Sequence, residues 1–344
     1  MMNHKGNVTV AVAGATGAVG EVMLELVASV AQTDWKVHAL ASERSLGKAV
    51  TFGQRQLQVE NLETFDFSDV DYALFSAGAS VSRVHAVRAA REGAIVIDNT
   101  SEFRYRDDIA LVVPEVNGQL LEDAGPGTII ANPNCSTIQM VVAVAPIHRA
   151  AGVERINIAT YQSVSGAGRS AMEELARQTA ERLNMRDINP QSFKQPIAFN
   201  VLPEIDVMQD NGYTKEEMKL HWETRKILGD DAINVNATAV RVPVFFGHAE
   251  AVHLETRDDI GIEEVTRLLS QAPGVELVEP RDGSGFATPV THASGKDPVF
   301  VSRIRRDLSH PRGIDLWVVS DNVRKGAALN AVQIMQAIEA RKVP

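Results

Sequence analysis

The segment that most limits the possible folds is GATGAVG at residues 14–20, which lies between an apolar run and an amphipathic run. The apolar run, Asn7–Ala13, has the length and composition of a buried strand, and Ala18–Ala31 has the periodicity of a helix. Glycines at such a turn permit close backbone approach, and free N–H groups at the helix start can hold a pyrophosphate. A plain strand–helix turn is the alternative, because one glycine pattern is weak by itself.

Strand and helix patterns continue to alternate over the first third of the chain. Further strands are expected at Lys36–Ala41, Asp71–Ala77 and Ala94–Asp98, with a helix at Val81–Arg91. This alternation predicts an α/β domain with a parallel sheet and helices on both faces.

The pattern changes from about residue 133, and a chain of 344 residues is long enough for two domains. We expect a second, α+β domain with a larger sheet. Its predicted strands are Val153–Val164, Ala237–Val244 and Gly313–Ser320, and its predicted helices are Arg169–Leu183, Thr214–Leu228 and Ile262–Gln271. Asp187–Pro203 is the expected long loop, and Asn322–Arg341 is the expected last helix.

Charge and composition exclude several classes of protein. The net charge of −10 argues against a nucleic-acid partner. No apolar run approaches the roughly 18 residues of a membrane span, and the first ten residues have no signal-peptide pattern. The only cysteine, Cys135, cannot form an internal disulfide, and no Cys/His spacing indicates a metal site. We therefore expect a cytoplasmic protein in which Cys135 serves either packing or chemistry.

The end of the second predicted strand bears on the choice of nucleotide. Sites for NAD usually place Asp or Glu there to hold the ribose hydroxyls. In this chain the strand runs into Ser42, Glu43 and Arg44. Ser42 and Arg44 suit a 2′-phosphate, provided that Glu43 points away, and a solvated polar turn is the alternative. The segment favours NADP.

Cys135 stands at the expected start of a helix, because Asn132-Pro-Asn134 precedes it and the apolar periodicity begins at Ile138. A helix N-terminus favours the thiolate form of a cysteine, and the same N–H groups can hold an oxyanion. A free cysteine is more often a small buried hydrophobe, but the polar neighbours of Cys135 oppose that interpretation. We expect a nucleophile.

A cysteine nucleophile needs a proton-transfer partner, and His248 is the candidate with the most informative context. It ends the run RVPVFFGH at residues 241–248, where an apolar strand breaks at glycine, so we expect a turn to present it. Arg241 in the same run can clamp a carboxylate bidentately. From the residues alone, other histidines stay possible.

These residues resemble the aspartate-semialdehyde dehydrogenase family, and the likeness runs nearly end to end. The matching segments are GATGAVG at 14–20, SERS at 42–45, SEFR at 101–104, NPNCSTIQ at 132–139, YQSVSGAGR at 161–169, EEMKLHWETRKILG at 216–229, RVPVFFGH at 241–248 and SDNVRKGAALNAVQI at 320–334. The resemblance implies a Rossmann-type NADP-binding domain of residues 1–132 plus 322–344, with a returning C-terminal helix. It also implies a catalytic and dimerisation domain of residues 133–321, as in glyceraldehyde-3-phosphate dehydrogenase.

The resemblance implies a role for each matching position. Cys135 is the nucleophile, His248 the acid/base, and Gln162 positions the acyl group. Arg241 binds the substrate carboxylate and Glu216 its amine, with the neighbouring Glu217 as an alternative. Arg104 and Lys219 form the phosphate site. The NADP site is lined by Gly14, Thr16, Gly17, Ala18, Val19, Ser42, Arg44, Ser165, Gly166 and Asn322.

The implied reaction interconverts aspartate semialdehyde, phosphate and NADP⁺ with aspartyl phosphate and NADPH. It belongs to the biosynthesis of lysine through diaminopimelate, and of threonine, methionine and isoleucine, in a homodimer or homotetramer. One alternative is N-acetyl-γ-glutamyl-phosphate reductase, whose blocked substrate amine would leave Glu216 without a purpose. The other is a non-catalytic NADP-binding protein, which the complete set of Cys135, Gln162, Arg241 and His248 opposes.

Overall fold

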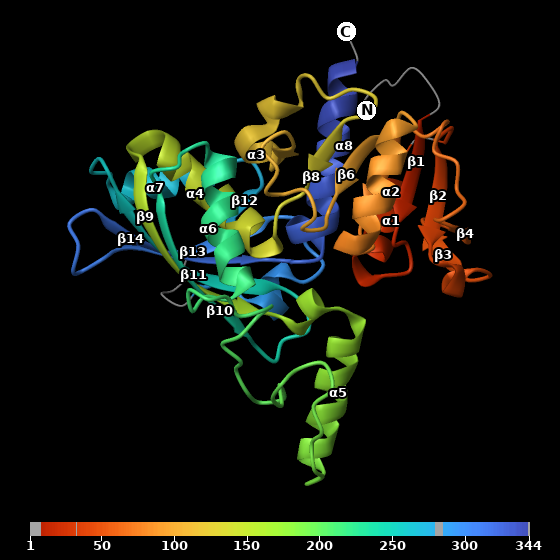
Figure 1. Ribbon diagram of the computed structural model, residues 1–344. Helices are drawn as coiled ribbons and strands as arrows, with labels where there is room; N and C mark the ends of the chain where they lie inside the picture. Colours follow the sequence, from red (N-terminus) through yellow and green to blue (C-terminus); the bar gives the residue numbers. More distant parts are fainter. Residues whose placement is uncertain (1–7, 32, 279–284, 343–344) are drawn as a thin grey trace. The chain divides into compact units, whose positions relative to one another are not determined.

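The computed structural model describes residues 8–31, 33–278 and 285–342, which form two compact units (Figure 1). Unit 1 comprises Met1–Asn134 and Ala327–Pro344, and unit 2 comprises Cys135–Gly326. The domain boundaries expected from the sequence lay after residues 132 and 321. Residues 1–7 and 343–344 of the expected first domain, including the expected strand start at Asn7, lie outside the described residues.

Unit 1 is built on an eight-stranded sheet with the strand order β3-β4-β2-β1-β5-β6-β8-β7. Its strand pairs are parallel except for the antiparallel β3–β4 hairpin, which was not predicted from the sequence. The strands are β1 (Thr9–Ala13), β2 (Lys36–Ala41), β3 (Ala49–Phe52), β4 (Arg55–Asn61), β5 (Tyr72–Phe75), β6 (Ile95–Asp98), β7 (Ala110–Leu111) and β8 (Ile129–Ala131). The predicted parallel sheet is confirmed.

Helices cover both faces of this sheet, as predicted. The helices of unit 1 are α1 (Ala18–Val30), α2 (Ala79–Arg91), the short α3 (Pro114–Asn117) and α8 (Leu329–Lys342). Helices α1 and α8 share one apolar core with the sheet, in which Met23 and Met335 are fully buried beside Val10 and Val12. The buried residues of α2 lie outside that core, and α2 packs on β5 and β6 from the opposite face.

The last helix begins later than predicted. It starts at Leu329, not at Asn322, and a π-helical turn at Arg324–Ala328 precedes it. The side chain of Asp321 explains the delay, because its Oδ1 accepts the backbone N–H groups of Val323 and Arg324 at 2.8 and 3.1 Å. These bonds hold the chain in a turn and delay the regular helix.

Unit 2 is built on a six-stranded sheet with the order β10-β9-β11-β14-β13-β12. Its strands are β9 (Val153–Gln162), β10 (Asn234–Arg241), β11 (His248–Thr256), β12 (Val275–Leu277), β13 (Val299–Arg306) and β14 (Gly313–Ser320). The pairs β9–β10 and β12–β13 are parallel, and the other pairs are antiparallel. The prediction of a second α+β domain is confirmed, but the expectation of a larger sheet was wrong, because this sheet has six strands and the sheet of unit 1 has eight.

One face of this sheet carries the helices of unit 2. Helix α4 (Cys135–Ala151) packs on β9, β11, β13 and β14, with α6 (Lys215–Leu228) and α7 (Ile262–Ser270) beside it (Figure 1). Helix α5 (Arg169–Leu183) follows the short turn at Val164–Ala167 and projects from the sheet in Figure 1. On the opposite face, Tyr161 and Trp317 lie 5.6 Å apart between ring centroids and are partly exposed.

Candidate active site

The strand topology of unit 2 brings three of the predicted site residues to one end of its sheet. Gln162 and Arg241 are the last residues of the parallel neighbours β9 and β10 and lie opposite each other in the register. The next strand, β11, runs the other way and begins at His248, so its first residue reaches the same end. We expected His248 on a turn after a broken strand, and this was wrong, because His248 starts the central strand β11 itself.

Cys135 is the first residue of α4, as predicted. It is half-buried, whereas the rest of the first two turns of α4 is buried against the sheet. The guanidinium of Arg241 lies within electrostatic reach of Cys135. Burial lowers the pKa of Arg241, while Glu216 and Cys135 act in the opposite direction. The thiol of Cys135 and the guanidinium of Arg241 therefore lie in one site.

A chain of polar contacts connects the amide of Gln162 to the first turn of α6. Its Nε2 donates to Oε1 of Glu216 and to Oγ1 of Thr160, both at 3.2 Å. The other oxygen of Glu216 accepts from Nζ of Lys219 at 2.8 Å, and Lys219 also donates to Asp206 at 2.8 Å. Burial alone lowers the pKa of Lys219, but Glu216 and Asp206 outweigh it and raise that pKa. Lys219 is therefore held as a cation.

The structure separates the two adjacent glutamates that the sequence left as alternatives. Glu217 belongs to the capping box of α6, in which its carboxylate accepts the N–H of Thr214 at 2.7 Å. Its second oxygen accepts the N–H of Ala239 at 2.9 Å. Glu217 is thus occupied with the fold, and Glu216 is the glutamate that faces Gln162.

His248 is completely buried, and Ser163 holds its ring. Nδ1 lies 3.1 Å from the backbone nitrogen of Ser163 and 3.1 Å from its Oγ. Nη1 of Arg241 donates to the Ser163 carbonyl at 2.8 Å, so Ser163 contacts both functional side chains. Burial lowers the pKa of His248 to about 3, and the charge of Arg241 adds to this effect.

Three residues expected in the cofactor site lie beside His248 within unit 2. Oδ1 of Asn322 accepts the backbone N–H of Gly247 at 2.9 Å and the hydroxyl of Ser163 at 3.0 Å. Its Nδ2 donates to Oγ of Ser165 at 3.0 Å. A Cβ placed on Gly166 would be 3.0 Å from Nη1 of Arg241 and 3.3 Å from Nε2 of His248. Ser163 was not predicted as a site residue, although its position directly after Gln162 at the end of a strand could have indicated a place in the site.

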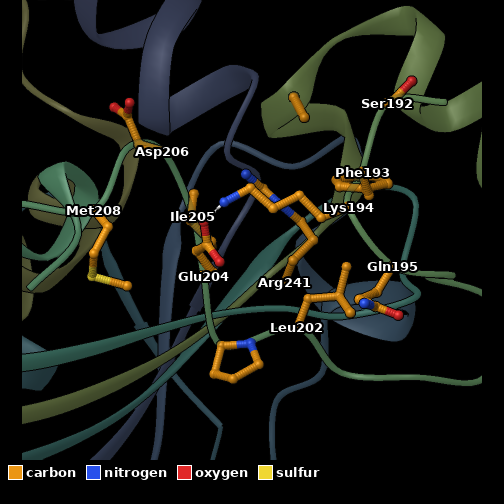
Figure 2. Close-up of a pocket in the computed structure, with 12 residues that line it drawn as sticks. Ser192, Phe193, Lys194, Gln195, Leu202, Glu204, Ile205, Asp206, Met208 and Arg241 are labelled. Atoms are coloured by element: carbon orange, nitrogen blue, oxygen red, sulfur yellow. Dashed lines mark hydrogen bonds and ion pairs between the residues drawn. The ribbon is translucent and has the colours of Figure 1, made fainter. Parts of the chain in front are cut away.

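A pocket of about 390 Å³ borders Arg241 (Figure 2). Part of its lining comes from the predicted long loop, which is irregular over Asp187–Pro203 apart from one bridge between Leu202 and Arg241. The rest comes from Ala167 and from residues 204–206 and 208, which follow the loop. Figure 2 shows the Lys194 ammonium directed at the Glu204 carboxylate, to which it donates a hydrogen bond. Asp206, the partner of Lys219, lines the same pocket and gave no signal in the sequence.

The expected nucleotide-binding residues at the start of the chain lie in unit 1. The segment 14–20 joins β1 to α1, and a Cβ on Gly20 would stand 2.1 Å from the carbonyl oxygen of Gly14. The predicted glycine turn is therefore confirmed as a position that excludes side chains. Thr16, Ala18 and Val19 lie on the same turn or in the first turn of α1, whose N-cap, Gly17, makes no side-chain capping bond.

The other two expected sites of unit 1 are placed differently. Ser42 and Arg44 are exposed at the short turn Glu43–Ser45 that follows β2. Arg104 is buried in unit 1, where its Nη2 donates to the carbonyl of Asn99 at 2.9 Å. Among the described residues, no group of three or more His, Cys, Asp or Glu is arranged to hold a metal ion. In the same part of the chain, no helix is both long and apolar enough for a bilayer span.

The fold and the cysteine-centred site define a class, the two-domain semialdehyde dehydrogenases. The NAD-binding domain model of that class matches residues 9–124, and its dimerisation domain model matches residues 144–325. Sequence comparison is more specific. The chain is 54% identical over 333 residues to the aspartate-semialdehyde dehydrogenase of Legionella pneumophila, covering 97% of this chain and 96% of that one.

A second sequence relative and a solved structure support the same family assignment. The chain is 56% identical over 329 residues to aspartate-semialdehyde dehydrogenase 2 of Vibrio cholerae, covering 96% and 97% of the two chains. The crystal structure of the V. cholerae enzyme II complexed with ASA superposes with a TM-score of 0.92 at 54% identity, covering 97% of this chain and 98% of that one. The chain therefore belongs to the aspartate-semialdehyde dehydrogenase family, whose members are oxidoreductases acting on an aldehyde.

Proposed function

We propose that this chain is an NADP-dependent aspartate-semialdehyde dehydrogenase that works through a thioester on Cys135. The reaction interconverts L-aspartate 4-semialdehyde, phosphate and NADP⁺ with L-4-aspartyl phosphate and NADPH. The observation that carries the proposal is the common location of a helix-start cysteine, the Gln162 amide, the Arg241 guanidinium and the His248 imidazole at one end of the unit 2 sheet.

The cofactor part of the proposal rests on residues of unit 1. Gly20 is buried so closely against the Gly14 carbonyl that the turn has no room for a side chain, and the first turn of α1, which has no side-chain cap, presents its N–H groups toward a pyrophosphate. Ser42 and the exposed Arg44 suit a 2′-phosphate, which favours NADP over NAD. When bound, NADP accepts or supplies the hydride.

In the oxidative direction, the thiolate of Cys135 adds to the aldehyde carbon and forms a thiohemiacetal. Arg241 holds the substrate carboxylate and Glu216 its amine, while Gln162 orients the reacting carbonyl with a neutral amide. The N–H groups at the start of α4 stabilise the developing oxyanion, a contribution of about 3 kcal/mol in comparable sites. His248 serves the same oxygen as the acid/base residue.

Loss of hydride from the thiohemiacetal carbon leaves the acyl group on Cys135 as a thioester. Arg104 and Lys219 form the proposed phosphate site, because a phosphate nucleophile must meet cations. Phosphate oxygen attacks the thioester carbon, the carbon–sulfur bond breaks, and aspartyl phosphate leaves with the thiolate regenerated. The biosynthetic reaction is the reverse, on the route to lysine through diaminopimelate and to threonine, methionine and isoleucine.

The proposed enzyme is a homodimer, or a homotetramer built from dimers. The match to a dimerisation domain and the partly exposed aromatic pair Tyr161 and Trp317, on the sheet face opposite α4, support association through unit 2. We place the enzyme in the cytoplasm, where a catalytic thiol stays reduced. Light scattering on the purified chain measures the subunit number directly.

The test is phosphate-dependent NADPH formation with aspartate semialdehyde, compared with N-acetylglutamate semialdehyde and with NAD in place of NADP. We expect activity on the first substrate, with a preference for NADP. Activity on the acetylated substrate alone would reassign the chain to N-acetyl-γ-glutamyl-phosphate reductase. Activity on neither would leave a non-catalytic nucleotide-binding protein, and a preference for NAD would overturn the assignment of Ser42 and Arg44.

A further inference from the structure

The two ring nitrogens of His248 have different surroundings. Nδ1 receives the backbone N–H of Ser163 at 3.1 Å. Nε2 is buried and has no hydrogen-bond partner among the described residues. It lies on the side of Gly166 and of the Arg241 guanidinium, which is the side proposed for the substrate carboxylate.

The ring is neutral at physiological pH. Burial is the largest influence on its pKa, and the neighbouring Arg241 cation adds to it, so the pKa of His248 falls to about 3. Glu216 and the Gly247 carbonyl act in the opposite direction and are smaller. A neutral imidazole carries one N–H, so one ring nitrogen donates and the other accepts.

The backbone N–H of Ser163 decides between the two nitrogens, because a backbone N–H can only donate. Nδ1 must therefore accept, and the ring proton lies on Nε2. The Ser163 hydroxyl has one proton and lies near two groups, Oδ1 of Asn322 at 3.0 Å, which accepts from it, and Nδ1 of His248 at 3.1 Å. The assignment of the tautomer therefore rests on the backbone N–H and not on this hydroxyl.

We infer that Ser163 is a positioning residue that fixes His248 as the neutral tautomer with its proton on Nε2. This inference rests on the proposed function for its consequence, which is that Nε2–H donates a hydrogen bond to the substrate oxygen as negative charge develops there. A neutral imidazole donor is an established way to stabilise an oxyanion. This is the arrangement that the proposed acid/base residue needs when it acts toward the substrate oxygen as a donor, because the ring proton lies on the nitrogen that is not held by Ser163.

The direct test is ¹⁵N NMR of histidine-labelled, ligand-free protein, with the His248 signals identified by their loss in His248→Asn. We expect the protonated nitrogen to be Nε2, unchanged from pH 5 to pH 9. A protonated Nδ1, or a midpoint near the ordinary value of about 6.5, would overturn the inference.

Substitutions then separate the backbone of Ser163 from its hydroxyl. Ser163→Ala keeps the N–H, so the tautomer should persist, whereas a switch to Nδ1–H would contradict the backbone assignment. Asn322→Asp places a carboxylate beside the Ser163 hydroxyl and close to His248, which should raise the His248 midpoint by a unit or more. An unmoved midpoint would show that the polar groups around Asn322 do not influence the ring.

Ser320→Ala is the matched control. Ser320 is the cross-strand neighbour of His248 in the register, is fully buried, and its Oγ has no hydrogen-bond partner among the described residues. Its removal should leave the NMR signals and the pH profile of kcat/KM unchanged. Because the NMR experiment uses no substrate, a wrong tautomer overturns this inference alone, whereas a correct tautomer in a protein inactive on aspartate semialdehyde overturns the proposed function alone.

Discussion

Gly326 lies against Cys135 so closely that a Cβ on Gly326 would stand 2.7 Å from the Cβ of Cys135 and 3.2 Å from its Cα. Gly326 belongs to the π-helical turn Arg324–Ala328, and its N–H donates to the Asp321 carbonyl at 3.1 Å. π-Helical turns are frequent at functional sites. The turn therefore forms a wall beside the proposed nucleophile that has room only for glycine.

Gly326→Ala should lower kcat by about 100-fold, because a displacement of about 1 Å at a reacting group costs about that much. The measurements are kcat and the rate of Cys135 alkylation by iodoacetamide. Gly118→Ala is the control, since Gly118 has a φ of −57° and no atom within 4 Å of an added Cβ. A folded Gly326→Ala protein with unchanged kcat would show that the wall does not position the thiol.

Asp206→Asn should raise the KM for phosphate several-fold with little change in kcat. Asp206 and Glu216 each hold Lys219 at 2.8 Å, and losing one charged partner costs about 1 kcal/mol in such a half-buried setting. Lys219→Ala should raise the same KM further, because it removes the cation itself. Initial rates at varied phosphate measure both effects.

Lys194→Ala separates a specific phosphate site from general positive charge near the pocket. Lys194 lines the same pocket and pairs with Glu204, but its side chain is 79% exposed. Exposed pairs contribute little, so the KM for phosphate should stay at the wild-type value. If Lys194→Ala and Lys219→Ala raised the KM equally, Lys219 would have no special place in the phosphate site.

His248 should make folding stability depend on pH. Its pKa is about 3 in the folded protein and about 6.5 when unfolded, so the unfolded chain binds more protons between these values. The stabilising contribution is complete above pH 6.5 and is lost as the pH falls towards 3, with a slope of at most about 1.4 kcal/mol per pH unit. Urea unfolding of His248→Gln from pH 7.5 to 5 should show a shallower decline than wild type, with Ser320→Ala as a parallel control. Parallel curves for wild type and His248→Gln would contradict the pKa.

The fold was largely predictable where polar and apolar residues follow the periodicity of one element. The first β1–α1–β2 segment, α2 and α6 show that regularity, and the structure has them within a few residues of the predicted bounds, while α4 begins at Cys135 as predicted. Strand β11 was missed because its inner positions include the polar residues His248 and Glu250, which hide the apolar alternation. A sequence pattern assumes that buried positions are apolar, and this assumption fails at the centre of the proposed active site.

The proposed site was predictable as residue types but not as contacts. Cys135, Gln162 and Arg241 were identified from motifs. Segments that are distant in the sequence meet because β9, β10 and β11 pair side by side and place Gln162, Arg241 and His248 at the same end of the sheet. The Ser163–His248 contact joins residues that are 85 positions apart, and the Asp206–Lys219 pair depends on an irregular loop. Neither relationship has a periodicity or a spacing that a single sequence could show.

Glu250 lies two residues after His248 on β11 and is completely buried. Neither of its carboxylate oxygens has a partner at hydrogen-bond geometry among the described residues, and the same holds for the amide of Gln139, one turn after Cys135 on α4. Burial raises the pKa of Glu250 well above its ordinary value, while the nearby Gln139 amide acts in the opposite direction. Burial therefore favours the protonated form of this carboxyl in the folded protein.

Glu250→Gln should stabilise the protein at alkaline pH, because a raised folded pKa gives stability that is lost as the pH rises from about 4.5 through that pKa. Below that range the amide and the protonated acid are near-isosteric and both neutral, so the two proteins should unfold at similar urea concentrations. Above it, wild type must either lose the proton to solvent and keep a carboxylate charge in a buried site, or unfold, whereas the variant has no proton to lose. Urea midpoints from pH 5 to 9 measure the difference, and Glu255→Gln, on the opposite face of β11, should follow wild type. A Glu250→Gln protein that is destabilised at every pH would contradict this prediction. It would mean that Glu250 stabilises the fold as a charged carboxylate and not as a neutral acid.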